Sequence, residues 1–212
     1  GVAYVGGYFR LSAFEYREYP QVQLISPLVG GTSYDISFWI SLANNGCGTS
    51  HVGIYFSVNT PPNGTIGVLN VTPQFEANLG FISDTTNWVL VEGCYLAQGG
   101  EEYITIGNFY NDVNTPVDPL CPNGGVTTSY YYIDDISISV GSAPQNIPFE
   151  LGGPVEACYE YTIEPDITGV NYTWEDGSHD PTLTVTQSGT YSLTVSIGCD
   201  YGVDSIEVTI LG

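Results

Sequence analysis

Apolar residues recur at every second position along much of the chain, and this pattern predicts β-strands. Between residues 33 and 43, Tyr34, Ile36, Phe38 and Ile40 share one side of such a strand, which puts that side in a core and the other in water. Similar strand-like runs cover 22–28, 51–58, 87–97, 102–110 and 130–140. Few stretches show helical periodicity, and 26 Gly with 13 Pro suit short strands joined by turns. We therefore expect an all-β protein.

The strand pattern breaks once, at "GSAPQNIPFELGGP", which is rich in Pro, Gly and polar residues and predicts a linker over 141–154. Residues 1–140 before it have the length and spacing of strands of a β-sandwich. Residues 155–212 after it carry short strands with turns between them, on the scale of a small immunoglobulin-like sandwich. The sequence thus predicts two domains in tandem.

A formal net charge of −21, with only Arg10 and Arg17 as cations, excludes the usual electrostatic binding of nucleic acid or anionic membranes. Divalent cations are the partners that such a charge attracts. No apolar run is long enough to span a bilayer, and the segment "GVAYVGGYFR" lacks the features of a signal peptide. We expect a mature or excerpted piece that does not insert into a membrane.

Five cysteines without a CxxC pair favour disulfides in an oxidising, extracellular compartment. Cys158 falls in an early strand of the second domain and Cys199 in a late one, so we expect these two to be joined. Cys47 and Cys121 both lie in loops rich in Gly or Pro, and we pair them. Cys94 is left over, and the odd count requires a free thiol or a partner elsewhere.

Long ordered strings carry a resemblance to a known family. The strings "YREYPQVQLISPLVGGTSYDISFWISLA", "VTPQFEANLGFISDTTNWVLVEGCYLAQGGEEYITIGNFYNDVNT" and "YYYIDDISI" resemble a domain of large surface and gliding-associated proteins of Bacteroidota. The resemblance implies a jelly-roll sandwich like those of galactose-binding-like and carbohydrate-binding modules. The second domain resembles the immunoglobulin-like (PKD-like) repeats of the same proteins, in which the cysteines matching Cys158 and Cys199 commonly pair. Such proteins are typically exported by the type 9 secretion system.

The chain departs from that family at its start, because the family's sandwich usually opens with a strand well before the segment that matches "GVAYVGGYF". Either the sequence is an excerpt, or another polypeptide supplies the strand. In the second case a sheet edge stays unpaired beside an open apolar groove, and an extended segment of a neighbouring molecule fills the groove by strand addition. Repeated head to tail, this contact makes a filament.

Two adjacent acids, Asp134 and Asp135, stand inside the otherwise apolar strand 130–140 and need a cation, hydrogen-bond donors or full exposure. In related carbohydrate-binding modules this pair lies beside a structural calcium ion, so the resemblance implies a calcium site here. The alternative is that one carboxylate accepts backbone N–H bonds while its neighbour faces water.

A second candidate calcium site is the segment "YNDVNTPVD", where Asn111, Asp112, Asn114 and Asp118 offer oxygen ligands within a few residues. The segment lacks the Gly and the terminal Glu of an EF-hand loop. Turns closed by Asn and Asp side chains explain the same composition without a metal ion.

Catalytic motifs are missing from the sequence, since His51 and His179 are far apart and no zinc spacing or nucleophile elbow occurs. We expect no enzyme. A carbohydrate ligand is an alternative, for which Tyr130 and Tyr131 beside a long loop are the candidates. Trp39 and Trp88 lie in alternating strands, and we expect both in the core.

Two short acidic patterns, Asp84-Thr85-Thr86 and Asp204-Ser205-Ile206, match the O-glycosylation signal of exported Bacteroidota proteins. Thr85 and Ser205 are the candidate acceptors. Together these features favour a non-enzymatic structural module of an extracellular or cell-surface adhesin or fibre, with copies of itself or neighbouring surface-protein domains as partners. A carbohydrate-binding module that attaches its parent protein to polysaccharide is the alternative.

Overall fold

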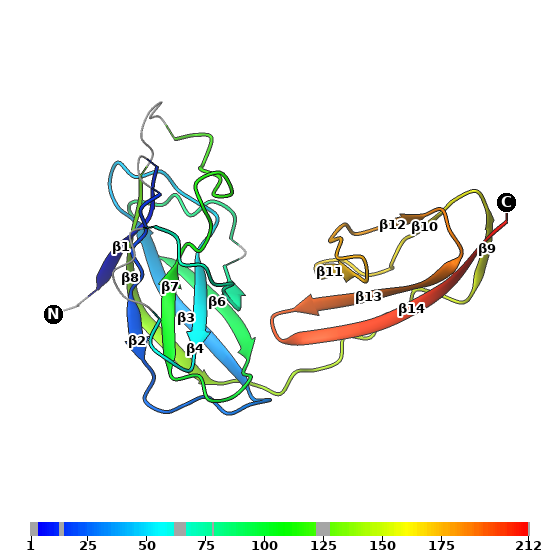
Figure 1. The fold of residues 1–212 in the computed structure, drawn as a ribbon, viewed down its shortest axis with the longest axis horizontal. Helices are drawn as coiled ribbons and strands as arrows, with labels where there is room; N and C mark the ends of the chain where they lie inside the picture. Colours follow the sequence, from blue (N-terminus) through cyan, green and yellow to red (C-terminus); the bar gives the residue numbers. More distant parts are fainter. Residues whose placement is uncertain (1–3, 13–14, 62–66, 78, 122–127, 212) are drawn as a thin grey trace. The chain divides into compact units, whose positions relative to one another are not determined.

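The computed structural model describes residues 4–12, 15–61, 67–77, 79–121 and 128–211. The chain divides into two compact units, Gly1–Ser142 and Ala143–Gly212 (Figure 1). Each unit has its own apolar core. The described ranges contain strands and turns but no helix, and hence no helix that could cross a membrane. The prediction of an all-β protein is confirmed.

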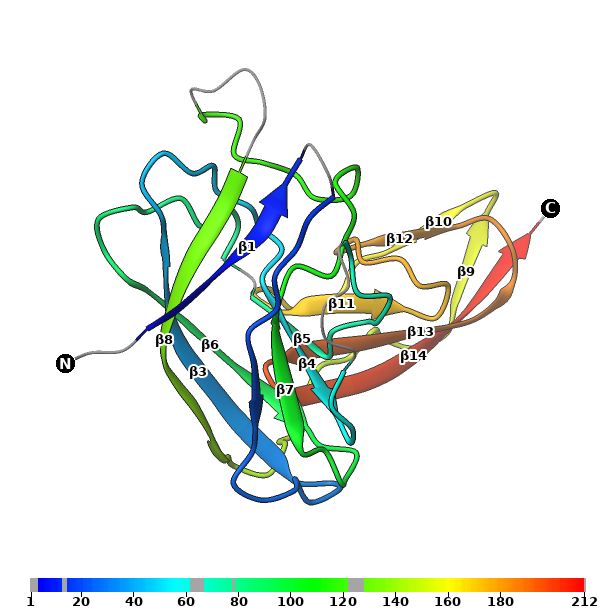
Figure 2. The ribbon, with the colours of Figure 1, turned by 60° about the vertical axis from the view of Figure 1, so that its left-hand side comes forward.

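Two antiparallel sheets form the first unit (Figure 2), and the described residues contribute eight strands to them. One sheet has the order β1-β8-β3-β6 and the other the order β2-β7-β4-β5. In both sheets, strands far apart in the sequence are therefore neighbours, as β8 is with β1 and β7 is with β2. The strands are β1 Val5–Leu11, β2 Gln21–Gln23, β3 Ser33–Leu42, β4 Gly53–Ser57, β5 Phe75–Glu76, β6 Val89–Leu96, β7 Tyr103–Gly107 and β8 Thr128–Val140.

One core fills the space between these sheets, as the alternation of β3 predicts. Ile36, Phe38 and Ile40 are buried in it, whereas Asp35 and Trp39 point to the opposite side. Trp39 and Trp88 are 38% and 39% exposed, so the expectation that both lie in the core is wrong. Trp39 directly follows a core residue, and the strand period of two therefore turns it outward.

A β-bulge divides β8 into two halves. Trp39 pairs with Asp134 and Ser37 pairs with Ser137, so that Asp135 and Ile136 together face the single residue Phe38. Asp135 adopts a left-handed φ of 50° at this point. The strand β1 pairs with β8 from Thr128 to Ile133 only, and its pairing ends just before the bulge.

The second unit is a smaller sandwich in which a long hairpin of β13 and β14 is the main element (Figure 1). Its sheets have the orders β11-β13-β14-β9 and β10-β12, and β9 runs parallel to β14. Trp174, Leu193 and Val195 lie at the centre of its core. The strands are β9 Val155–Cys158, β10 Tyr161–Ile163, β11 Asn171–Trp174, β12 Leu183–Val185, β13 Gly189–Ile197 and β14 Asp200–Leu211.

The segment predicted as a linker, 141–154, differs from a free linker, because most of it packs on the second unit. Ile147 donates a backbone hydrogen bond to Tyr201, and the Leu151 N–H binds a carboxylate oxygen of Asp204 at 2.7 Å. Ile147, Phe149 and Leu151 also pack against the core of that unit. Pro and Gly mark irregular backbone, but the apolar residues spaced between them decide that the segment is packed.

A disulfide joins Cys47 to Cys121 with a Cα–Cα distance of 5.6 Å, which confirms this pairing. The bond fastens the loop before β8 to the loop after β3. It closes 74 residues of chain, and on the chain-entropy model that contributes roughly 4 kcal/mol to the stability of the first unit.

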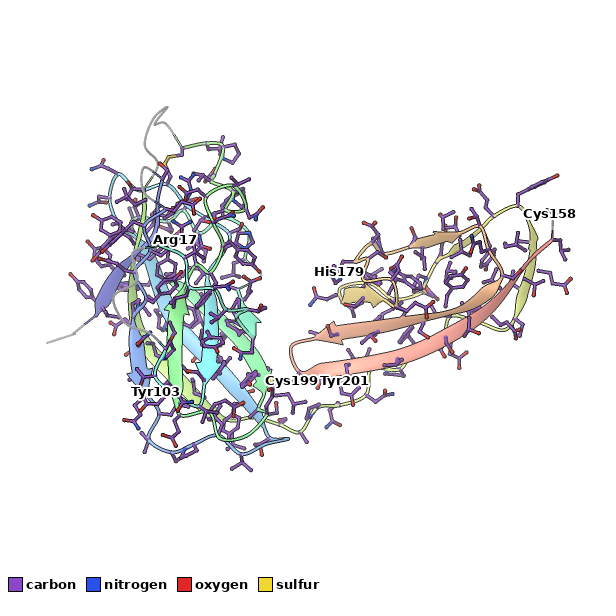
Figure 3. The ribbon with its side chains drawn as sticks, in the orientation of Figure 1. Arg17, Tyr103, Cys158, His179, Cys199 and Tyr201 are labelled. Carbon is purple, nitrogen blue, oxygen red and sulfur yellow. A yellow bond between two sulfur atoms is a disulfide. The ribbon has the colours of Figure 1, made fainter. Side chains whose placement is uncertain are left out.

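The predicted disulfide between Cys158 and Cys199 is wrong, because Cys158 is a free, exposed thiol. Cys158 ends β9 opposite Leu211, whereas Cys199 lies in the hairpin turn before Asp200, at the other end of β14 (Figure 3). The 12 residues of β14 span roughly 35 Å at about 3.3 Å each, and a disulfide tolerates a Cα–Cα distance below about 7 Å. The sequence spacing did not reveal that β9 pairs in parallel with the far end of β14.

We predict that Cys158 alone among Cys47, Cys121 and Cys158 reacts with iodoacetamide in the native, unreduced protein, since only Cys158 is free and exposed. Peptide mapping without reduction checks this, and a peptide pair linking Cys47 to Cys121 should appear in the same digest. Recovery of Cys158 in a linked peptide would contradict the structure.

Candidate functional site

An apolar groove of about 870 Å³ opens at one side of the first unit. Its walls are the second half of β8 and the segment that contains β2, and its floor is β7. The residues that define it are Val22, Leu24, Ile106, Ile136, Ile138 and Val140. None of the residues that line this groove carries a charge, although the chain as a whole has a net charge of −21.

The two halves of β8 are covered to very different extents. In the first half Ser129, Tyr131 and Ile133 point to the core and are at most 1% exposed. In the second half Ile136 is 36% and Val140 70% exposed, although both line the groove. The difference follows from the pairing, because β1 covers the first half on its outer edge and no described strand covers the second.

In the described part of the chain, the groove lies between the unpaired edges of two strands, β8 of one sheet and β2 of the other. From Asp134 to Val140, β8 pairs with β3 on one side, and on the other side no strand of the described residues pairs with it. Likewise β2 pairs with β7 and is the last strand of its sheet. Unpaired backbone donors and acceptors beside an apolar floor are the features that accept an added strand.

The two adjacent acids of β8 stabilise the bulge. Asp134 accepts a hydrogen bond at 2.9 Å from the N–H of Asp135 through its Oδ1, and the Asp135 side chain is exposed. This matches the alternative in which one carboxylate binds a backbone donor and its neighbour faces water. A calcium ion beside the pair stays a prediction.

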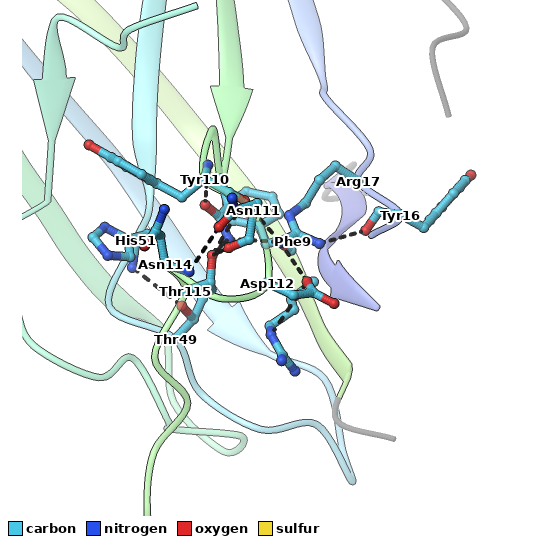
Figure 4. A network of polar contacts seen from close by, with 12 residues as sticks. Phe9, Tyr16, Arg17, Thr49, His51, Tyr110, Asn111, Asp112, Asn114 and Thr115 are labelled. Atoms are coloured by element: carbon cyan, nitrogen blue, oxygen red, sulfur yellow. Dashed lines mark hydrogen bonds and ion pairs between the residues drawn. The ribbon is translucent and has the colours of Figure 1, made fainter. Parts of the chain in front are cut away.

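Arg17 lies beside Asp112 of the second candidate calcium segment (Figure 4), and Arg10 pairs with the same carboxylate. Asp112 Oδ1 lies 2.8 Å from Nη2 of Arg17 and 3.6 Å from Nε of Arg10. Arg17 is buried and also donates to the carbonyl oxygens of Tyr16 and Tyr110. Sequence reasoning missed this network, although two cations among 23 acids are a signal that each has a specific carboxylate.

The other residues of that segment also have partners within the protein. Asn111 Oδ1 accepts the N–H of Asn114 at 2.9 Å. Asp118 accepts from the Ser83 hydroxyl at 2.6 Å and from the N–H of Leu120. The hydrogen bond from Ser83 is the main reason that the pKa of Asp118 is lowered. The contacts to Asn114 and Leu120 are local turn contacts, whereas the one from Ser83 joins distant parts of the chain. Calcium at this segment stays a prediction.

Among the described residues, no group of three or more His, Cys, Asp or Glu side chains is arranged to hold a metal ion. The two histidines belong to different units: the His51 ring contacts the Tyr110 ring in the first unit, with centroids 4.3 Å apart, and His179 Nδ1 lies 2.8 Å from the carbonyl oxygen of Tyr172 in the second.

The two tyrosines predicted to bind a ligand lie on opposite faces of β8. Tyr131 is fully buried, donates to the carbonyl oxygen of Ile82 at 2.7 Å and accepts from the N–H of Thr49 at 2.8 Å. It is a core residue, so its predicted role in ligand binding is wrong. Tyr130 points outward and lines a hollow between β8 and the turn after β3.

The candidate glycosylation sites both expose their hydroxyl-bearing side chains. Thr85 lies on a turn where Asp84 accepts from the N–H groups of Thr86 and Asn87, and these bonds lower the pKa of Asp84. Ser205 lies within β14, where it pairs with Ser192. Modification of either residue stays a prediction.

A buried acid that the sequence did not single out is Glu101. Burial raises its pKa, but the hydrogen bonds donated by Tyr95 Oη and by the N–H groups of Gln98 and Gly99 outweigh burial and lower the pKa below its ordinary value. The carboxylate thereby holds the turn between β6 and β7.

No family model matches the chain, and no curated protein matches it. Among solved structures, it is similar to the K3 cleaved adhesin domain of Lys-gingipain from Porphyromonas gingivalis, with 15% identity and a TM-score of 0.34, over 65% of this chain and 72% of that one. The K1 cleaved adhesin domain of the same protein has 16% identity and a TM-score of 0.28, over 67% and 86%.

A third similar structure is the adhesin domain of Epf from Streptococcus pyogenes, with 12% identity and a TM-score of 0.32, over 92% of this chain and 72% of that one. TM-scores this low carry no argument about function, which has to come from the geometry of the chain itself.

We predict that Arg17→Met lowers the free energy of unfolding of the first unit by roughly 3 kcal/mol, because it leaves a partly buried carboxylate and two carbonyl oxygens without their donor. Calorimetry of the full chain measures the loss. Arg10→Met is the comparison and should cost less than Arg17→Met, because the ion pair of Arg10 with Asp112 is longer, at 3.6 Å against 2.8 Å. Equal losses in the two variants would refute the assignment.

We also predict that Glu101 makes the first unit sensitive to acid. Its pKa is lowered in the folded protein, so its stabilising effect is complete above the unfolded pKa of about 4.3 and is lost as the pH falls through the folded value. Glu101→Gln should therefore be less stable at pH 7 by about 2 kcal/mol and should lose less on acidification. Parallel pH profiles of melting temperature for the two proteins would contradict this.

Proposed function

We propose that this chain is a non-enzymatic structural module of an extracellular adhesin or fibre, and that its first unit associates with other copies by strand addition in the groove beside β8. The incoming segment is extended, and its alternate apolar side chains enter the groove. The observation that supports this proposal most strongly is the difference between the two halves of β8. Within the described chain, β1 covers the outer edge of the first half, and no strand covers the outer edge of the second.

Strand addition would satisfy two groups of atoms at once. The backbone donors and acceptors on the outer edge of 136–140 would gain partners, and Ile136, Ile138 and Val140 would lose contact with water. At about 25 cal/mol per Å² of apolar surface, removal of such side chains from water is a substantial driving force. Because the groove has no charged lining residue, an uncharged apolar segment fits it better than any charged one.

Charge makes the association dependent on salt. Each copy carries −21, and repulsion between copies opposes their contact at low ionic strength. Salt shortens the screening length to about 10 Å at 0.1 M and to about 3 Å at 1 M. The apolar groove is unaffected by screening, so self-association of this module should strengthen with salt.

An extracellular location agrees with the Cys47–Cys121 disulfide, because such bonds persist in oxidising compartments. The sequence also predicts structural calcium, O-glycosylation and export by type 9 secretion, and we include these three predictions in the proposal. A carbohydrate-binding role, the second hypothesis, involves a different face of the first unit.

We predict that the full chain self-associates in a concentration-dependent manner and that 1 M NaCl strengthens this association. The double variant Ile136→Lys, Val140→Lys should weaken it by roughly 100-fold, because each added strand would then bury unpaired charge. Both positions are already exposed in the single chain, so the variant should keep its fold. Sedimentation velocity over a range of concentrations measures the association.

The double variant Ile197→Lys, Val203→Lys is the matched control, since it places the same two charges on exposed residues of β13 and β14 in the second unit. Unchanged association in this control is the expected result. A chain that stays monomeric at high concentration and high salt, or a double variant that associates as strongly as the wild type, would overturn the proposal.

A further inference from the structure

Six aromatic rings follow one another across the outer face of the sheet that contains β1 and β8, and we call them the aromatic strip. In spatial order they are Trp88, Tyr4, Tyr132, Tyr130, Tyr8 and Tyr16. Successive ring centroids are 6.2, 5.0, 5.5, 4.8 and 5.9 Å apart. Each ring contacts the next, so the strip is continuous.

The pairing of β1 with β8 places the central rings of the strip side by side. Tyr130 and Tyr132 alternate with the buried Tyr131, and Tyr8 pairs with Tyr130 across the two strands. Gly6 pairs with Tyr132, and a Cβ at Gly6 would lie 2.6 Å from the Tyr130 hydroxyl oxygen. The glycine therefore gives the Tyr130 ring room to lie over the backbone of β1.

The strip is not part of the core. Tyr4 is 57% exposed and Trp88 39%, and the other members are half-buried by one another on the solvent side of the sheet. A contiguous exposed aromatic surface is unusual on a soluble domain and typically marks a binding site. It lies on the outside of the sandwich, whereas the strand-addition groove opens to its core.

A polar hollow of about 550 Å³ accompanies the strip. Tyr8, Tyr130 and Tyr132 form its aromatic side, and its polar side includes Glu18 together with Asn44 and Asn45 from the turn after β3. That turn is anchored on the strip, because the N–H of Ala43 donates to the Tyr130 carbonyl oxygen at 2.8 Å.

Glu18 is held in place at the hollow. Its Oε2 accepts the N–H of Tyr8 at 3.0 Å, and its Oε1 accepts the Tyr16 hydroxyl at 2.9 Å. Both arginines are engaged with Asp112 instead. The nearby carboxylate raises the pKa of Tyr16, chiefly through this hydrogen bond. The carboxylate thus stays an acceptor that can take further donors from a ligand.

The ligand that fits this surface has flat apolar faces and many hydroxyl donors. The central rings of the strip meet edge to face, at 72° between Tyr132 and Tyr130 and 81° between Tyr130 and Tyr8, and they supply separate apolar surfaces for sugar rings. The carboxylate and amide groups supply acceptors and donors beside them. Nucleic acids and anionic glycans are excluded by the charge of −21. A proline-rich peptide would bring carbonyl acceptors against the Glu18 carboxylate, which offers no donor to them.

We propose that the aromatic strip binds a neutral polysaccharide, with sugar rings stacked on Tyr8, Tyr130 and Tyr132 and sugar hydroxyls bound by Glu18, Asn44 and Asn45. The module would then have two separate faces for association, one for polypeptide strands and one for glycan.

Affinity electrophoresis of the full chain through gels containing a β-glucan, an α-glucan, a mannan or a galactan tests the proposal, with polygalacturonate as the anionic comparison. At least one neutral polymer should retard the chain and polygalacturonate should not. Tyr130→Ala and Tyr132→Ala should each weaken the retardation at least tenfold, and Glu18→Gln should weaken it in a chain that still melts cooperatively.

Tyr159→Ala is the matched control, because it removes a tyrosine that is 81% exposed on the second unit, and its binding should equal that of the wild type. The lysine variants of the groove should also keep glycan binding, which separates this proposal from strand addition. No retardation by any neutral polymer, retardation unchanged in both strip variants, or binding of a proline-rich peptide in place of glycan would each overturn the assignment.

Discussion

The bulge at Asp135 and Ile136 is the constraint on which the arrangement of the first unit depends. One extra residue in β8 interrupts its ladder with β3, and the hydrogen bond from the Asp135 N–H to the Asp134 carboxylate stabilises the turn of the backbone there. Before the bulge, β8 has a neighbouring strand on both sides, and its core-facing residues are buried. After it, β8 has one neighbouring strand in the described chain, and its groove-lining residues Ile136 and Val140 are exposed.

The scarcity of positive charge determines which other contacts matter. A chain with 23 acids and two arginines cannot neutralise its carboxylates by ion pairs, so most of them are solvated or bind backbone donors. Asp112 forms ion pairs with both arginines. Glu101, Asp118 and Glu18 accept hydrogen bonds from hydroxyl and N–H groups. No residue that lines the apolar groove is charged, so contact with another chain in the groove buries no carboxylate of this chain.

The local pattern of apolar and polar residues predicts the strands of this protein well. It does not predict which strands, far apart in the sequence, pair with one another. Alternation predicts the strands and the core residues of β3. Applied strictly, it would also have separated Tyr130 from Tyr131, since neighbours in a strand face opposite sides. The parallel pairing of β9 with the end of β14, which separates Cys158 from Cys199, depends on contacts that no local pattern encodes. The meeting of Arg17 with Asp112, 95 positions apart, is likewise a product of the fold.

Amide hydrogen exchange of β8 tests most directly whether the second half of this strand accepts an added strand. In dilute solution, peptides from 128–133 should be protected, because β1 and β3 flank them, whereas peptides from 135–140 should exchange part of their amides quickly. On association at high concentration and salt, the 135–140 amides should become protected while those of 128–133 stay unchanged. Full protection of 135–140 in the dilute monomer, or exchange there that does not slow on association, would contradict the claim.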